Sequence, residues 1–108
     1  MKTEDLVREI DRLKPIYLHR LFQHYKGGVY KIIGIVFDSS SDEFALRYER
    51  VAGPHFNEAN EAGIEFTRTV RDFEMKVLGT NNVIVPRFVH VAPRATTVYV
   101  PIVNPAIG

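Results

Sequence analysis

The first segment of the chain carries apolar residues at the helical period. Leu6, Ile10 and Leu13 fall on one stripe, and charged residues fill the remaining positions. Pro15 has no amide proton and disfavours helical geometry in the residue before it. The pattern therefore predicts an amphipathic helix over residues 3–14 that packs along one face.

After this helix the pattern changes to that of β-strands. Segments rich in aliphatic and aromatic residues are bounded by clusters of Gly, Ser, Asn and Asp. The predicted strands are Ile16 to Tyr25, Val29 to Asp38, Glu43 to Ala52, Ile64 to Val70 and Val83 to Val91. Pro86 should confine the last of these to an edge or a bulge. The short links "KGG" and "SSSD" have the length that joins neighbouring antiparallel strands.

Two of these strands differ in how their apolar residues are distributed. Phe44, Leu46 and Tyr48 alternate with smaller or charged residues, which is typical of a strand with one buried face. The segment from Ile32 to Phe37 is apolar on both sides, as in a central or covered strand. Gly34 in its middle indicates a sharp bend or bulge.

Several short strands with a bent central strand predict a mainly β fold. We expect a single domain over residues 1–108: a small, strongly bent barrel over 16–91, closed on one side by the N-terminal helix, and an apolar tail over 92–108. The segment Gly53 to Gly63 has no consistent period and is predicted to be a loop.

The apolar tail has two interpretations. It can be the last strand of the barrel, or it can lie across a neighbouring subunit. Pro101 and Pro105 would interrupt a central ladder, which favours the second interpretation and a homo-oligomer.

Composition narrows the class of protein. Of the 108 residues, 45% are hydrophobic and 25% charged, as in an ordinary globular domain. Lys and Arg number 14 against 13 Asp and Glu, so the net charge of +1 argues against a DNA-binding protein. The chain has no cysteine, no apolar signal-peptide region near its N-terminus and no long apolar run. We expect a cytoplasmic protein that does not enter a membrane.

Enzymatic and metal-binding patterns are missing from the sequence. The four histidines, His19, His24, His55 and His90, form no metal-ligand spacing. There is no Gly-x-Ser-x-Gly motif and no phosphate-binding glycine loop. The sequence therefore predicts no catalytic residue, no metal and no cofactor.

Arginines interleaved with aromatic residues are the strongest functional signal. A guanidinium group can hold a phosphate through two hydrogen bonds, and an aromatic ring can stack on a base. The near-neutral charge favours a small anionic ligand over a nucleic-acid polymer. The same residues also occur on the exterior of any small barrel, as ordinary surface ion pairs. The candidate ligand-binding residues are Tyr25, Lys26, Arg47, Tyr48, Phe66, Arg68 and Arg71.

Several spaced motifs resemble a known family. They are His24-Tyr25-Lys26-Gly27 with Tyr30 and Gly34, then Glu43, Tyr48, Arg68 with Phe73, and Pro86-Arg87-Phe88. In this order they resemble a small bacterial and phage family catalogued only as a domain of unknown function, over about Tyr17 to Val91. The resemblance implies a strongly bent SH3-like barrel and supplies no catalytic residues.

A second resemblance is one of layout. A short helix ending in Leu-Lys-Pro, a Lys-Gly hairpin barrel and an oligomerising tail look like phage anti-defence sponges, which sequester nucleotide immune signals of CBASS or Thoeris systems. This likeness implies a non-catalytic protein that binds a cyclic oligonucleotide or a cyclic ADP-ribose isomer. The alternative is a small interaction module that binds a protein segment or RNA.

Overall fold

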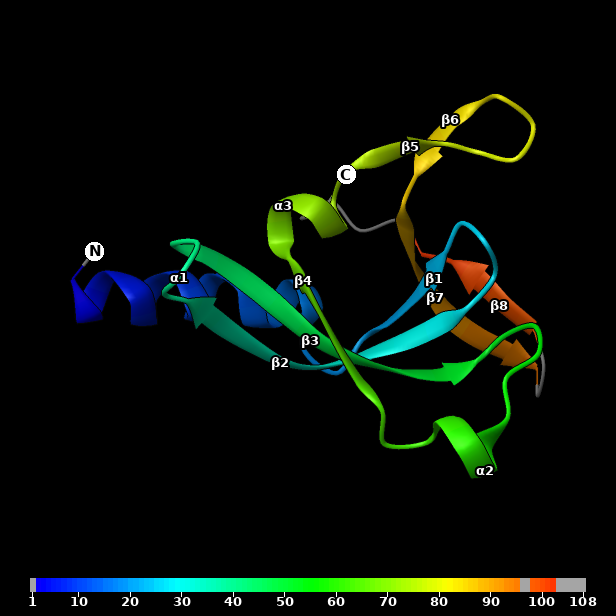
Figure 1. The fold of residues 1–108 in the computed structure, drawn as a ribbon, viewed down its shortest axis with the longest axis horizontal. Helices are drawn as coiled ribbons and strands as arrows, with labels where there is room; N and C mark the ends of the chain where they lie inside the picture. Colours follow the sequence, from blue (N-terminus) through cyan, green and yellow to red (C-terminus); the bar gives the residue numbers. More distant parts are fainter. Residues whose placement is uncertain (1, 96–97, 103–108) are drawn as a thin grey trace.

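The strands form two antiparallel sheets. The computed structural model describes residues 2–95 and 98–102. The larger sheet has six strands in the order β4-β3-β2-β1-β7-β8, and β5 and β6 form a separate hairpin (Figure 1). The elements are α1 Thr3–Tyr17, β1 Leu21–His24, β2 Val29–Asp38, β3 Glu43–Ala52, α2 Glu58–Glu61, β4 Glu65–Thr69, α3 Val70–Phe73, β5 Lys76–Leu78, β6 Ile84–Pro86, β7 Phe88–Ala95 and β8 Val98–Pro101.

This architecture confirms the prediction of a mainly β fold with one N-terminal helix. Within the described residues the large sheet has β4 and β8 as its two edges, and no ladder joins them. The short helices α2 and α3 were not predicted. The expected loop Gly53 to Gly63 contains α2, and Val70, the expected end of a strand, begins α3.

The helix α1 is longer than predicted. It continues through Pro15 to Tyr17, so the expected end at Lys14 is wrong. Tyr17 lies on the same stripe as Leu13, and the two side chains are only 1% and 2% exposed. Burying a large aromatic ring stabilises the last turn enough to offset the hydrogen bond that the proline removes.

The long hairpin β2–β3 carries the bend of the sheet. The pairing shifts register between Ile32 and Gly34, which confirms the predicted bulge. A Cβ atom at Gly34 would lie 2.8 Å from Nη1 of Arg47, so a side chain at this position would require the end of the Arg47 side chain to move. Leu46 and Tyr48 of β3 are buried, as their alternation predicts.

The turn between β1 and β2 packs against the end of β3. Gly27 and Gly53 have φ angles of 109° and 110°, in a region that only glycine adopts at low cost. A Cβ atom at Gly53 would lie 2.7 Å from the carbonyl oxygen of Gly27. The two glycines therefore allow the neighbouring turn and strand end to approach closely, and the turn holds Tyr25 and Lys26 just beyond the end of β1.

Two predicted strand boundaries are wrong. The first strand begins only at Leu21, because Ile16 and Tyr17 belong to α1. The expected strand Val83 to Val91 is two strands, β6 and β7, with Arg87 between them. Pro86 ends β6, where the missing amide costs the hairpin little.

The C-terminal segment adds an edge strand. β8 pairs with β7, with Pro101 opposite Val91, so residues 98–101 complete the sheet as a last strand. β7 itself runs past the expected end of the barrel to Ala95. Pro105 and the other residues of 103–108 lie outside the described residues, and the expectation that the tail reaches a neighbouring subunit remains a prediction there.

The hydrophobic core joins α1 to both halves of the large sheet. Its buried members are Leu13, Tyr17, Phe22, Ile32, Leu46, Tyr48, Phe73 and Phe88. The rings of Phe73 and Phe88 stack with centroids 4.0 Å apart. Among residues 2–95 and 98–102, no helix is long and apolar enough to cross a membrane.

Candidate functional site

The pairing of β3 with β4 places three candidate residues together. Tyr48 lies directly opposite Phe66, and their rings stack with centroids 5.8 Å apart. Arg68 lies two positions further along β4, on the same face. Its Nε donates a hydrogen bond to the Tyr48 hydroxyl at 3.3 Å.

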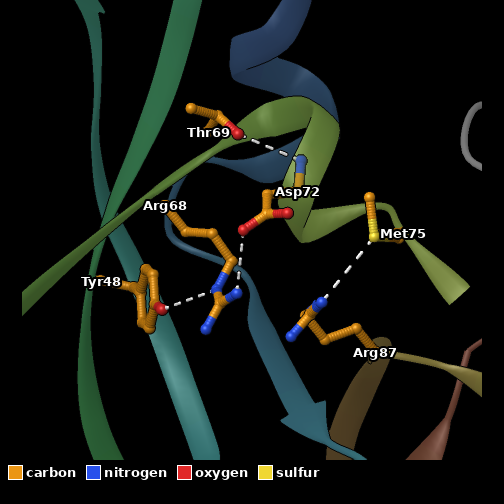
Figure 2. A network of polar contacts seen from close by, with 6 residues as sticks. All are labelled: Tyr48, Arg68, Thr69, Asp72, Met75 and Arg87. Carbon is orange, nitrogen blue, oxygen red and sulfur yellow. Dashed lines mark hydrogen bonds and ion pairs between the residues drawn. The ribbon is translucent and has the colours of Figure 1, made fainter. Parts of the chain in front are cut away.

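The short helix α3 holds the other side of the Arg68 guanidinium. Thr69 precedes this helix, and its hydroxyl accepts a hydrogen bond from the Asp72 amide at 3.1 Å. The Asp72 carboxylate then accepts a hydrogen bond from Nη1 of Arg68, also at 3.1 Å. Figure 2 shows Arg68 held between the Tyr48 hydroxyl and Asp72.

Arg87 approaches the same region from the junction of β6 and β7. Its amide donates to the carbonyl of Met75, and its carbonyl accepts from the amide of Tyr25, both at 3.0 Å. Its Nη2 lies 3.9 Å from the Met75 sulfur. In Figure 2 the side chain of Arg87 extends toward Arg68.

The guanidinium group of Arg87 has fewer hydrogen-bond partners than that of Arg68. Its Nε is buried and has no hydrogen-bond partner in the described part of the chain. Of the ion pairs formed by residues 2–95 and 98–102, none involves Arg87 or Lys26. A buried donor without a partner is costly, so an acceptor that reached this group would bind favourably.

His24 lies among these positive charges. Burial lowers its pKa to about 4, and the charges of Arg68, Lys26 and Arg87 act in the same direction. Its Nδ1 accepts a hydrogen bond from the Lys26 amide at 3.2 Å. We call His24, Lys26, Arg68 and Arg87 the cationic cluster.

Packed aromatic rings support the cationic cluster. The Arg68 guanidinium lies 5.9 Å from the centroid of Phe88, and the His24 ring meets Phe88 edge-on at 5.0 Å. On its other side His24 packs against Tyr25 at 4.5 Å, and the Lys26 ammonium lies 5.7 Å from the Tyr25 ring. The structure thus gathers cations over aromatic faces, the two chemical features expected from the sequence.

The candidate residues from the sequence divide into two groups. Tyr25, Lys26, Tyr48, Phe66 and Arg68 belong to the cationic cluster or to the rings around it. The other two candidate residues, both arginines, lie elsewhere.

Arg47 and Arg71 are engaged in surface ion pairs. Arg47 points to the opposite face of β3 and contacts Glu65 at 2.6 Å. Arg71, whose side chain is 77% exposed, pairs with Glu43 at 3.0 Å. Exposed pairs of this kind contribute little to stability or binding, so nothing links these two residues to the cationic cluster.

Sequence reasoning did not select His24 and Arg87 as ligand-binding residues. Both lie inside motifs that the sequence shows, His24-Tyr25-Lys26-Gly27 and Pro86-Arg87-Phe88. Each motif places a basic residue beside an aromatic one at the end of a strand, and this was the signal by which the sequence could have indicated these two residues. Their proximity depends on β1 pairing with β7, where His24 lies opposite Phe88.

Two hollows on the described surface are lined by residues outside the cationic cluster. The larger, of about 520 Å³, adjoins the β1–β2 turn and is lined by Gln23, Gly27, Val29, Ala52, Gly53, Pro54, Val98 and Tyr99. The smaller, of about 290 Å³, lies beside α2 and includes Arg50 and Phe56. Arg50 already donates hydrogen bonds to the carbonyl groups of Ala52 and Pro54, so its role there is structural. In the described part of the chain, no three His, Asp or Glu side chains are grouped to hold a metal ion.

Fold and site together define a small antiparallel β protein with a surface cluster of cations over packed aromatic rings. Residues 20–90 match the model of the family described as a protein of unknown function, DUF1653, and the chain belongs to this family. The family resemblance seen in the sequence is thereby confirmed.

A solved structure of a DUF1653 protein from Bordetella bronchiseptica is similar to this chain. The two sequences are 26% identical, the TM-score is 0.52, and the match covers 82% of this chain and 94% of that one. None of the curated proteins matches the chain. The range matched by the family model, residues 20–90, contains the whole cationic cluster and excludes all of α1 and all of β8.

Proposed function

We propose that this protein is a non-catalytic binding protein for a small anionic ligand of the nucleotide type. The observation that carries the proposal is that the side chain of Arg87 extends toward Arg68, with its Nε buried and without a partner in the described residues. A phosphate group accepts several hydrogen bonds at once and suits two neighbouring guanidinium groups. In this proposal the phosphate lies between Arg68 and Arg87.

The charge of the site supports a doubly charged ligand. Lys26, Arg68 and Arg87 supply three permanent positive charges, and Asp72, which binds Arg68, supplies one negative charge. The remaining excess of two positive charges matches two phosphodiesters or one phosphomonoester. Phe66 is 43% exposed and stacks on Tyr48, so it offers a free aromatic face to a base.

The specific ligand we propose is a nucleotide-derived immune signal. A cyclic oligonucleotide or a cyclic ADP-ribose isomer, of the kind made in CBASS or Thoeris defence, has the required phosphates and bases. The part of the likeness to phage anti-defence sponges that supports this choice is the Lys-Gly hairpin in a small β fold, since the helix does not end at Leu-Lys-Pro. A protein of this type acts by stoichiometry: it binds the signal tightly and releases it chemically unchanged.

A thermal-shift panel tests the proposal. The ligands are cyclic dinucleotides, cyclic trinucleotides and cyclic ADP-ribose isomers, each in excess. A ligand present at about 100 times its Kd should raise the Tm by roughly 10 °C for a chain of this size. Absence of a shift with every member of the panel would contradict the proposal.

Matched variants locate the binding site. Arg87→Gln should abolish the shift at little cost in stability, because Arg87 forms no ion pair in the described residues. Arg47→Gln is the control, since Arg47 lies on the other face of β3. Equal losses in both variants would show that the effect is general electrostatics and not a site. Recovery of the intact ligand after heat denaturation separates sequestration from catalysis.

The alternative, an interaction module for a protein segment or RNA, has one observation in its favour. Leu78 and Ile84 lie opposite each other on the β5–β6 hairpin and are 61% and 69% exposed. Exposed apolar pairs on a projecting element are typical of binding surfaces. Co-purified RNA or a captured peptide partner, together with no response to small ligands, would favour the alternative.

A homo-oligomer is part of the proposal, because one small protein offers only part of an enclosing pocket. A chain that ends at Ile102 keeps β8 and removes only residues 103–108. This truncation should lower the molar mass in light scattering without lowering the Tm of the remaining domain. An unchanged molar mass would show that residues 103–108 are not needed for assembly.

A further inference from the structure

His24 occupies a position that the proposed phosphate site does not yet use. Its ring packs against those of Tyr25 and Phe88, at the end of β1. The charged groups that act on it come from three directions: Lys26 from its own turn, Arg68 from β4 and Arg87 from the β6–β7 junction. All three are positive, and Asp72, the carboxylate nearest in this network, is bound to Arg68.

The hydrogen bonding of His24 defines its protonation state in the free protein. Its Nδ1 accepts a hydrogen bond from the Lys26 amide, which leaves the single ring proton on Nε2. Protonation of Nδ1 would convert this acceptor into a donor. It would also release the Lys26 amide, which is exposed and can donate to another acceptor.

We propose that His24 takes up a proton from solvent when an anion binds between Arg68 and Arg87, and that the imidazolium then becomes a further charged contact to the ligand. This inference rests on the proposed function, because it needs an anion at that place. The step adds one proton to Nδ1 and breaks no covalent bond. The Lys26 amide, released from Nδ1, becomes an additional donor to the same anion.

The physical reason is a reversal of the local field. In the free protein the neighbouring cations and partial burial disfavour a charged imidazole, and its pKa lies at about 4. A bound dianion offsets the neighbouring cations, and an opposite charge within about 6 Å raises the pKa of a histidine by about 1–3. The affinity for the anion should therefore increase as the pH falls. Between the His24 pKa in the complex and that in the free protein, the increase is up to about tenfold for each pH unit.

An NMR titration of the histidine side chains tests the inference. The probes are inorganic sulfate and a cyclic dinucleotide, whose charged oxygens do not titrate between pH 4.5 and 7.5. The His24 pKa should rise by at least 1 when either probe saturates the site, while the NMR signals of His55, in the exposed loop, change little on binding. The variant His24→Gln should lose the gain in affinity for sulfate that the unmodified protein shows as the pH falls from 7 to 5. The variant His55→Asn, in which asparagine tolerates the positive φ of 61°, is the control and should keep that gain.

The outcomes separate the two proposals. If the probe shifts the signals of Arg68 and Arg87 while the His24 pKa stays the same, proton uptake is refuted and the binding site stands. If neither probe binds at any pH, the proposed function fails and proton uptake fails with it. If His24→Gln keeps the gain in affinity at low pH, another group takes up the proton and the assignment to His24 is wrong.

Discussion

Acidification should destabilise the folded protein through His24, even when no ligand is present. The folded structure lowers the pKa of this residue from its ordinary value of 6.5 to about 4, chiefly through burial. Between these two pH values the unfolded chain binds more protons than the folded one. The stability that the neutral side chain retains above pH 6.5 is therefore lost progressively as the pH falls towards 4.

The magnitude follows from the difference between the two pKa values. A difference of about 2.5 corresponds to about 3.4 kcal/mol at most. Because His24 is only half-buried, screening by water reduces the expected effect to about 1–2 kcal/mol.

The assay compares two proteins by urea denaturation at pH 7 and pH 4.5. The free energy of unfolding of the unmodified protein should fall by about 1–2 kcal/mol more than that of His24→Gln. The pKa of His90 is also lowered, chiefly by burial, but His90 is present in both proteins and its effect cancels in the difference. Parallel losses of stability in the two proteins would refute the reasoning, because they would show that His24 titrates equally in the folded and unfolded chains.

Three variants test other parts of the structure by denaturant or thermal unfolding. Gly53→Ala should lower the free energy of unfolding by about 2 kcal/mol or more, because a Cβ atom there would lie 2.7 Å from the Gly27 carbonyl oxygen at a φ of 110°. An unchanged free energy of unfolding would mean that the turn packs differently. Phe88→Ala should lower the free energy of unfolding by about 3–5 kcal/mol, since it removes a ring that stacks on the buried Phe73. A loss below about 1 kcal/mol would contradict the position of Phe88 in the core. The double variant Leu78→Ser with Ile84→Ser should change the stability of the isolated chain by no more than about 1 kcal/mol, because both side chains are exposed; a large loss would show that the β5–β6 hairpin is buried in solution.

Much of the fold could be predicted from local pattern. The β2–β3 hairpin, with its bounds and its bulge at Gly34, follows from the apolar period and from a single glycine in a long strand. The end of α1 could not be predicted in the same way. Pro15 is a local stop signal, and the burial of Tyr17 against the sheet outweighs it. The break at Arg87 was missed for a similar reason, since Val83 to Val91 is continuously strand-like in sequence.

The sequence predicted the chemical type of the candidate site, but not which residues form it. The sequence shows that arginines alternate with aromatic residues along β3 and β4. Whether an arginine joins the cationic cluster depends on which face of its strand it occupies and on what lies opposite. Arg47 and Arg68 look alike in sequence, but the first pairs with Glu65 while the second binds the Tyr48 hydroxyl.

The sequence by itself determined the elements of this protein: the amphipathic helix, the two-residue period of the strands and the glycine turns. These depend on interactions between residues close along the chain, which local steric and solvation preferences control. Only the tertiary structure decided that His24, Arg68 and Arg87 meet. They come from β1, β4 and the β6–β7 junction, and their meeting requires the pairing of β1 with β7 and the short turn of α3. Long-range pairing is fixed by the burial of the shared core, so no local pattern specifies which charged side chains it brings together.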